Sequence, residues 1–155
     1  MAWCLDLDPS TNSKITIWLL KNVNNAEEIQ KRLFDGHLKC CIIKASLIID
    51  PFQIAVAANK ALVAESLTTK TIFTEILFNL SISKNITSSL QTFGISATDK
   101  ELLIVSIDNL KETSHSLNFI EGDEVDMKIL NQFTDVNMVK KIYKISDVES
   151  KTMIC

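Results

Sequence analysis

The stretch KITIWLLKNV at residues 14–23 decides how this chain folds. Its β-branched and large apolar residues favour a strand. Both faces of this strand are largely apolar. One face carries Ile15, Ile17 and Leu19, and the other carries Thr16, Trp18 and Leu20. A strand that is apolar on both faces is normally covered on both. We therefore expect a sheet with other elements packed on it.

The residues after this strand predict a helix and then a second extended segment. Asn24-Asn25 offers a helix cap, and apolar residues recur at helical spacing from 26 to 34 until Gly36 stops the pattern. The run IIKASLII at residues 42–49 suits a short extended segment. The chain thus opens as strand, helix, strand.

A long helix is predicted next, over residues 52–67. Asp50-Pro51 marks its start, because aspartate is a good N-cap and proline suits the first helical position. The first three turns are apolar almost all round, which requires burial on more than one side. Two interpretations remain open: a central core helix, or a helix that also presents an apolar stripe to a partner.

The segment 71–82 fits a helix face and a strand alternation equally well, so periodicity does not decide it. Asn85 is predicted to cap a short helix that runs through Leu90 and Phe93. Gly94 follows at the position where a left-handed residue is usually needed.

The last third of the chain contains the clearest second strand, ELLIVSI at residues 101–107. Residues 109–134 are polar, with a weak helical pattern around Val125, Ile129, Leu130 and Phe133. A final helix is predicted over residues 135–145, with Val136, Val139, Ile142 and Tyr143 on one face. This order predicts an α+β fold, a small β-sheet packed against several helices.

The size and composition predict a single domain over residues 1–155. A chain of 155 residues with 46% hydrophobic content supports one core, and three glycines leave little room for a linker. The four cysteines have no framework spacing, and the opening MAWCLDLDPS lacks the pattern of a signal peptide. We expect an intracellular protein with no membrane segment, because charged residues interrupt the apolar stretch 40–64.

No arrangement of residues predicts catalysis or a cofactor. His37 follows a helix stop and His115 lies in a polar stretch, away from any nucleophile pattern. His37, Cys40 and Cys41 lack the spacing of a zinc site, and isolated glycines do not make a phosphate-binding loop. The acidic run 121–126 is typical of a solvated loop. The chain is therefore expected to bind rather than to catalyse.

The charge balance argues against a protein whose whole surface binds nucleic acid. The net charge is −3, and phosphate binding depends on clustered cations. Among the basic residues only Arg32 is an arginine, the side chain that best grips phosphate. Any RNA contact must be local, and the candidates for it are Lys60, Asn79, Lys84, Asn85, Lys140 and Lys141. Lysines on one helical face are more often simply its solvated side.

Several segments, in order along the chain, resemble one known family. They are residues 50–62 (DPFQIAVAANKAL), 75–81 (EILFNLS), 85–97 (NITSSLQTFGISA), 103–105 (LIV) and 139–144 (VKKIYK). They are similar to the TPRKB (PRPK-binding protein) family, the small kinase-binding subunit of the KEOPS/EKC complex. The resemblance runs from about residue 14 to about residue 146, and several long matches in order are more specific than one short motif.

The resemblance implies an α+β fold, no enzymatic activity and no cofactor. It implies docking on the atypical kinase subunit of KEOPS, with the other subunits and tRNA as indirect partners, in support of threonylcarbamoyl-adenosine modification. It also implies a place in the cytoplasm and nucleus, recruitment of tRNA through its 3′ end in archaeal relatives, and a helix over 71–82.

The resulting candidates for partner contacts lie on two helices: Phe52, Val56, Asn59, Val63, Ile142 and Ile145. Family members usually continue into a further C-terminal helix, whereas this chain stops at KTMIC, residues 151–155. The resemblance therefore predicts a domain shortened at its C-terminus and weaker or altered docking. Three alternatives stand beside kinase docking: an RNA-binding module that contacts tRNA, a degenerate paralogue that has lost docking, and a small-molecule enzyme, the least favoured.

Overall fold

A computed structural model describes residues 2–35, 40–108 and 120–143. The strands are β1 (Trp3–Asp6), β2 (Lys14–Lys21), β3 (Cys41–Lys44), β4 (Leu102–Ile107) and β5 (Asp123–Val125). The α-helices are α1 (Ala26–Phe34), α2 (Pro51–Val63), α3 (Ile72–Leu80), α4 (Ile86–Phe93) and α5 (Val136–Tyr143). Short 3₁₀ turns are η1 (Pro9–Thr11), η2 (Ala45–Leu47) and η4 (Met127–Gln132). The predicted α+β class is confirmed.

One antiparallel sheet of five strands forms the centre of the molecule. Its order is β1-β2-β4-β3, and β5 also pairs with β2. Residues 15–17 of β2 face β1, whereas residues 19–21 face β5. The two short strands therefore lie end to end along one edge of β2.

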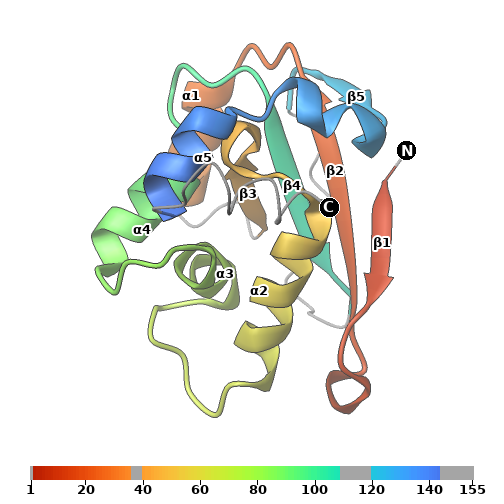
Figure 1. Ribbon diagram of the computed structural model, residues 1–155, viewed down its shortest axis with the longest axis vertical. Coiled ribbons are helices and arrows are strands. Elements are labelled where there is room, and N and C mark those ends of the chain that lie inside the picture. The colour runs from red at the N-terminus through yellow and green to blue at the C-terminus, as the bar shows by residue number, and fades with distance from the viewer. Residues whose placement is uncertain (1, 36–39, 109–119, 144–155) are drawn as a thin grey trace.

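Helices cover both faces of this sheet, as the two-sided apolar pattern of β2 predicts. Ile15, Ile17 and Leu19 belong to a core shared with α2, α3 and the side chain of Val139 from α5. Leu20 belongs to a second core, on the opposite face, that includes the buried side of α1. In Figure 1, α2, α3, α4 and α5 lie in front of the sheet and α1 lies behind it.

Local capping explains where several helices begin. The Asp50 carboxylate accepts a hydrogen bond from the Phe52 amide at 2.8 Å, and the Asn85 side chain accepts one from the Ser88 amide at 2.8 Å. Thr71 and Thr74 form a capping box at the start of α3. The predicted starts of α2 and α4 are thus confirmed, as is the helix over 71–82.

Several expectations differ from the structure. The helix α2 ends at Val63 rather than Leu67, because Ala64 is extended, with a ψ of 138°. The extended segment predicted over 42–49 is a strand only as far as Lys44 and then turns into η2. The weak helical pattern around Val125 to Phe133 is a short strand followed by a 3₁₀ turn. The sequence does not predict strand β5, because three residues are too few to show an alternation of apolar and polar side chains.

Gly94 is a further correction. Its φ of −72° is not left-handed, so backbone conformation does not require a glycine there. A Cβ at this position would lie 2.5 Å from the Leu90 carbonyl oxygen. Glycine is needed because the chain leaves α4 in close contact with its last turn.

Asn25 stands at the N-cap position of α1, but its side chain makes no capping hydrogen bond. The Asn25 Oδ1 atom instead accepts a hydrogen bond from the Glu121 amide at 2.9 Å. Asn25 therefore joins the start of α1 to a segment almost a hundred residues away. Gly36, the predicted stop of this helix, lies outside the described residues. In the described part of the chain, no helix is long and apolar enough to cross a membrane.

Candidate functional site

Helix α2 presents two different surfaces. Its inner side is built from Ile54, Ala57, Ala58 and Ala61, all buried, and the small alanines let the helix pack closely on its neighbours. Its outer side carries Phe52, Val56 and Val63, which are 57%, 55% and 48% exposed. Spacings of four and seven residues place these three side chains on one face of the helix. The helix is therefore a core helix that also has an exposed apolar stripe.

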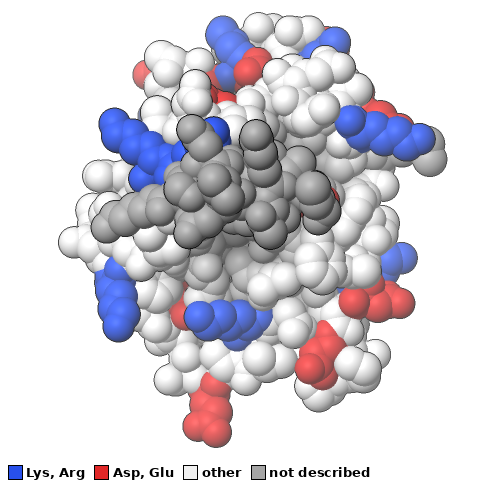
Figure 2. All heavy atoms as spheres, viewed as in Figure 1, with Lys and Arg blue, Asp and Glu red and all other residues white. Residues whose placement is uncertain are grey.

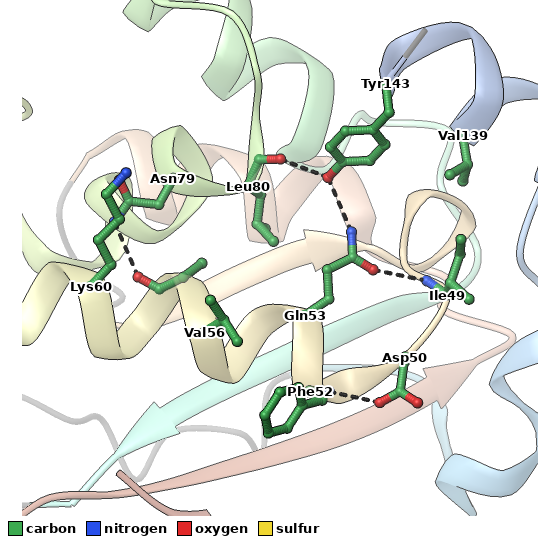
Figure 3. A pocket seen from close by; sticks show the side chains of 11 residues that line it. Ile49, Asp50, Phe52, Gln53, Val56, Lys60, Asn79, Leu80, Val139 and Tyr143 are labelled. Atoms are coloured by element: carbon green, nitrogen blue, oxygen red, sulfur yellow. Dashed lines mark hydrogen bonds between the residues drawn. The ribbon is translucent and has the colours of Figure 1, made fainter. Parts of the chain in front are cut away.

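A groove of about 700 Å³ lies beside this stripe. Its walls come from α2, from the end of α3 and from α5, and Figure 3 shows Phe52, Val56 and Lys60 on the α2 side. Asn79 and Leu80 line it from α3, and Val139 and Tyr143 line it from α5. The groove joins two consecutive helices, α2 and α3, to α5 from the end of the described chain.

Hydrogen bonds fix the polar side chains of the groove. The Gln53 Nε2 atom donates to the Tyr143 hydroxyl at 3.0 Å, and its Oε1 atom accepts from the Ile49 amide at 3.2 Å. The Tyr143 hydroxyl donates to the Leu80 carbonyl oxygen at 2.6 Å, as Figure 3 shows. Burial raises the pKa of Tyr143, an effect that the Gln53 hydrogen bond opposes. The tyrosine is therefore a neutral structural donor at physiological pH.

Comparison with known protein families assigns this chain to one of them. Residues 20–154 match the profile of a family described as kinase binding protein CGI-121. The chain belongs to the CGI-121 family. This result confirms the resemblance found in the sequence, and it covers the α2 stripe and all three walls of the groove.

Several relatives of this chain are named as subunits of the EKC/KEOPS complex. The chain is 35% identical over 152 residues to the EKC/KEOPS complex subunit TPRKB of Danio rerio, an alignment that covers 94% of this chain and 87% of the relative. It is 30% identical to the EKC/KEOPS complex subunit CGI121 of Yarrowia lipolytica, over 88% of this chain and 83% of the relative. A 26% identical relative is the subunit cgi121 of Schizosaccharomyces pombe, over 91% and 86%.

Some of the residues predicted to contact a partner lie together in the structure. Phe52 and Val56 line the groove, and Val63 continues the exposed stripe beyond it. Asn59 is half-buried, and its Oδ1 atom accepts a hydrogen bond from the Asp8 amide at 2.9 Å. Ile142 is partly buried against the core. Ile145 lies outside the described residues.

The predicted RNA contacts are spread over several elements. Lys60 and Asn79 share the groove, but the Asn79 side chain donates to the Ala57 carbonyl oxygen at 3.1 Å. Lys84 and Asn85 precede α4, where Asn85 is the cap. Lys140 and Lys141 lie on α5. Figure 2 shows basic side chains at several separate places on this face, some beside acidic ones.

Exposed apolar residues of α5 were missed by the sequence reasoning. Val136 is 40% exposed and Met138 is 44% exposed, although Val136 shares its predicted helical face with Val139, Ile142 and Tyr143. The helix packs against the core through Val139, Ile142 and Tyr143 alone. Val139, Ile142 and Tyr143 form a narrower stripe than the predicted face that also includes Val136. That narrower stripe was the sequence signal for the side of α5 that packs on the core.

The described cysteines and acidic residues offer neither a reactive thiol nor a metal site. Burial raises the pKa of the Cys40 thiol to about 12, and burial likewise raises the pKa of Cys41, so neither is a ready nucleophile at neutral pH. The described ranges contain no group of three or more histidine, cysteine, aspartate or glutamate side chains placed to hold a metal ion. His37 and His115 lie outside them.

Proposed function

We propose that this chain is a non-catalytic subunit of a KEOPS/EKC complex that docks on the atypical kinase subunit through helix α2. One observation carries the proposal: Phe52, Val56 and Val63 form an exposed apolar stripe on α2 in a chain that belongs to a kinase-binding family. Exposed apolar patches of this kind mark protein interfaces. The stripe leaves the core intact, because the opposite side of α2 supplies the core packing.

The groove supports binding rather than chemistry. Three of its polar side chains, Gln53, Asn79 and Tyr143, are each bonded to groups of the protein itself. Such fixed polar groups shape a surface, whereas a general acid or base must be free to exchange a proton with a substrate. An interface with an apolar centre and a polar rim is the arrangement typical of stable complexes.

Co-elution with the KEOPS kinase subunit of the same organism tests the proposal. The wild-type chain is expected to elute with the kinase as a stoichiometric complex in size-exclusion chromatography. Val56→Glu and Val63→Glu should elute separately from it, because each places a charge in the apolar stripe. Both variants should keep the wild-type circular dichroism, since neither side chain is buried.

A matched control separates docking from general stickiness. Phe34 is 91% exposed and lies on α1, outside the groove, so Phe34→Glu should leave co-elution unchanged. Unchanged co-elution of both α2 variants would move the interface elsewhere. Separate elution of the folded wild-type chain and the kinase would mean that this family member has lost docking.

The cellular role follows from the same proposal. The subunit would support threonylcarbamoyl-adenosine modification of tRNA as part of the complex, in the cytoplasm and nucleus. A strain that lacks its own subunit should recover the modified nucleoside when it expresses this chain, as measured by mass spectrometry of digested tRNA. The Val56→Glu variant should restore it less, and the Phe34→Glu variant should restore it fully. Imaging of the tagged chain tests the two compartments.

A further inference from the structure

The outer edge of β1 has unused pairing capacity. The Leu7 amide donates to the Ser13 carbonyl oxygen at 3.0 Å, and the same antiparallel register continues along β1 and β2. Backbone groups alternate in direction along an antiparallel strand. Trp3 and Leu5 therefore bond to β2, and the amide and carbonyl groups of Cys4 and Asp6 point away from it.

Within the described ranges, no strand pairs with this outer edge. Figure 1 shows β1 as the outermost element on its side of the sheet. The next amide that points outward belongs to Asp8, and it donates to the Asn59 side chain of α2 at 2.9 Å. The open edge is thus a short section at Cys4 and Asp6, with α2 closing one end.

A groove of about 230 Å³ runs between this edge and α2. Its apolar lining comes from Leu5 and Leu7 on the strand side and from Phe52, Ala55 and Val56 on the helix, and Asp6, Asp8 and Asn59 also line it. Phe52 and Val56 are more than half exposed. A strand added to β1 would place every second side chain in this groove.

The opposite face of the edge is acidic. Asp6 is exposed and, together with Asp8 and Asp108, lines a polar hollow that also contains Lys14. The hollow contains three carboxylates and one amine, so its net negative charge attracts a basic side chain. The alternate side chains of an added strand would lie here, beside Asp6.

We propose that the open edge of β1 binds an extended segment of a partner protein by strand addition. The segment alternates apolar residues, which enter the groove beside Phe52 and Val56, with lysine or arginine beside Asp6. Backbone hydrogen bonds with Cys4 and Asp6 fix its register. A second copy of this chain fits less well, because pairing two β1 edges gathers the acidic residues of both copies on one short ladder. The groove shares Phe52 and Val56 with the proposed kinase-docking stripe, but the open edge of β1 is observed whether or not the kinase docks there.

The test uses a fluorescent peptide of about eight residues that alternates valine with lysine. Fluorescence polarisation should show saturable binding to the full chain. Two methylated peptides identify backbone pairing, one methylated on the valine amides and the other on the lysine amides. One of them should lose binding and the other should keep it, because only one edge of the peptide bonds to β1. Loss on lysine methylation indicates antiparallel pairing, and loss on valine methylation indicates parallel pairing.

Variants of the chain complete the test. Cys4→Pro removes an amide that points to the open edge, a position where proline is tolerated, and should weaken binding about tenfold. Asp6→Lys should weaken binding of this peptide and strengthen binding of a valine–glutamate peptide. Phe34→Ala and Val63→Glu lie outside the groove and should leave binding unchanged, which separates this edge from the kinase-docking stripe.

Three results would overturn the proposal. The first is no binding at peptide concentrations up to about 1 mM. The second is equal sensitivity to both methylated peptides, which would mean contact through side chains alone. The third is a concentration-dependent dimer of the chain in sedimentation that Cys4→Pro abolishes, which would assign the edge to a second copy.

Discussion

The hydroxyl of Tyr143 donates a hydrogen bond to the carbonyl oxygen of Leu80 at 2.6 Å, and so joins the end of α5 to the end of α3. The last carbonyls of a helix have no partner within the helix, and this one is satisfied from another element. Gln53 of α2 donates to the same hydroxyl. A single phenol thus connects the three helices that wall the groove.

Replacing Tyr143 with phenylalanine should destabilise the protein by about 1–2 kcal/mol, because a part-buried carbonyl and the Gln53 amide both lose a partner. The ring contact with Phe93, at 6.0 Å between centroids, is retained. Urea unfolding followed by circular dichroism measures the change. Lys141→Ala, at an exposed position of the same helix, is the control and should leave the midpoint unchanged. Equal midpoints for wild type and Tyr143→Phe would show that water replaces the lost bonds.

The two sides of α2 should respond differently to the same enlargement. Ala58→Leu should cost about 1–3 kcal/mol of the free energy of unfolding, because Ala58 has no exposed surface and added methyl groups must displace neighbours. Val56→Leu should change stability by less than about 0.5 kcal/mol, because Val56 is 55% exposed. Chemical denaturation of the two variants makes the comparison. A larger loss for Val56→Leu would mean that the stripe is packed rather than exposed.

Glu75 should make stability depend on pH in the acid range. Burial alone would raise the pKa of Glu75, but hydrogen bonds from Thr69 and Thr68 outweigh it, and the pKa lies below its ordinary value of 4.5. A lowered folded-state pKa contributes stability that is present above about pH 4.5 and is lost as pH falls through the lowered value. Melting temperatures between pH 7 and pH 3 measure this loss.

The variant Glu75→Gln serves as the reference for this prediction, because its side chain has no carboxylate to protonate. It should be less stable than wild type at pH 7, since an amide accepts the Thr69 and Thr68 hydrogen bonds less strongly. The difference should narrow as the pH falls. A difference that stays constant down to pH 3 would exclude Glu75 as the source.

Gly94→Ala should destabilise the protein by about 1–3 kcal/mol, since the new Cβ would lie 2.5 Å from the Leu90 carbonyl oxygen. The φ of −72° is accessible to alanine, so the cost comes from the contact and not from backbone strain. Thermal unfolding measures it, with Ala97→Ser at an exposed site of the same connection as the control. Equal stability of Gly94→Ala and wild type would mean that the end of α4 shifts freely.

The isolated chain should bind tRNA weakly, because its candidate basic residues are spread over α2, the segment before α4, and α5. Filter binding between about 50 and 200 mM salt should show a shallow salt dependence. A steep slope that falls by about one for each of Lys140→Ala and Lys141→Ala would instead establish α5 as an RNA contact. Lys14→Ala, on β2, is the control.

Much of the fold could be predicted because it depends on neighbouring residues. The alternation in β2 predicted the two cores, and the Asp50-Pro51 and Asn85 signals predicted the starts of α2 and α4. Each of these depends on side chains within one turn or one strand. The segment of α3 was ambiguous from periodicity, and only the family resemblance favoured a helix.

The candidate site could be predicted only in part. The apolar residues of α2 were evident, but which of them lie outside depends on where the sheet and α3 cover the helix. Asn59 and Asn79 illustrate the limit, because both bond to segments that sequence spacing does not connect to them. Such asparagines have the same appearance in a sequence whether they contact a partner or the protein itself.

The sequence by itself determined the α+β class, the family and the helix that carries the apolar stripe, since these follow from local patterns and from similarity along the chain. The tertiary structure alone decided that α2, α3 and α5 meet around Tyr143 and that β5 continues the edge begun by β1. It also decided that the outward backbone groups of Cys4 and Asp6 face no other described strand. The physical reason is range. Capping and periodicity act between residues a few positions apart. Grooves and open sheet edges depend instead on which distant segments pack together and which surfaces they leave uncovered.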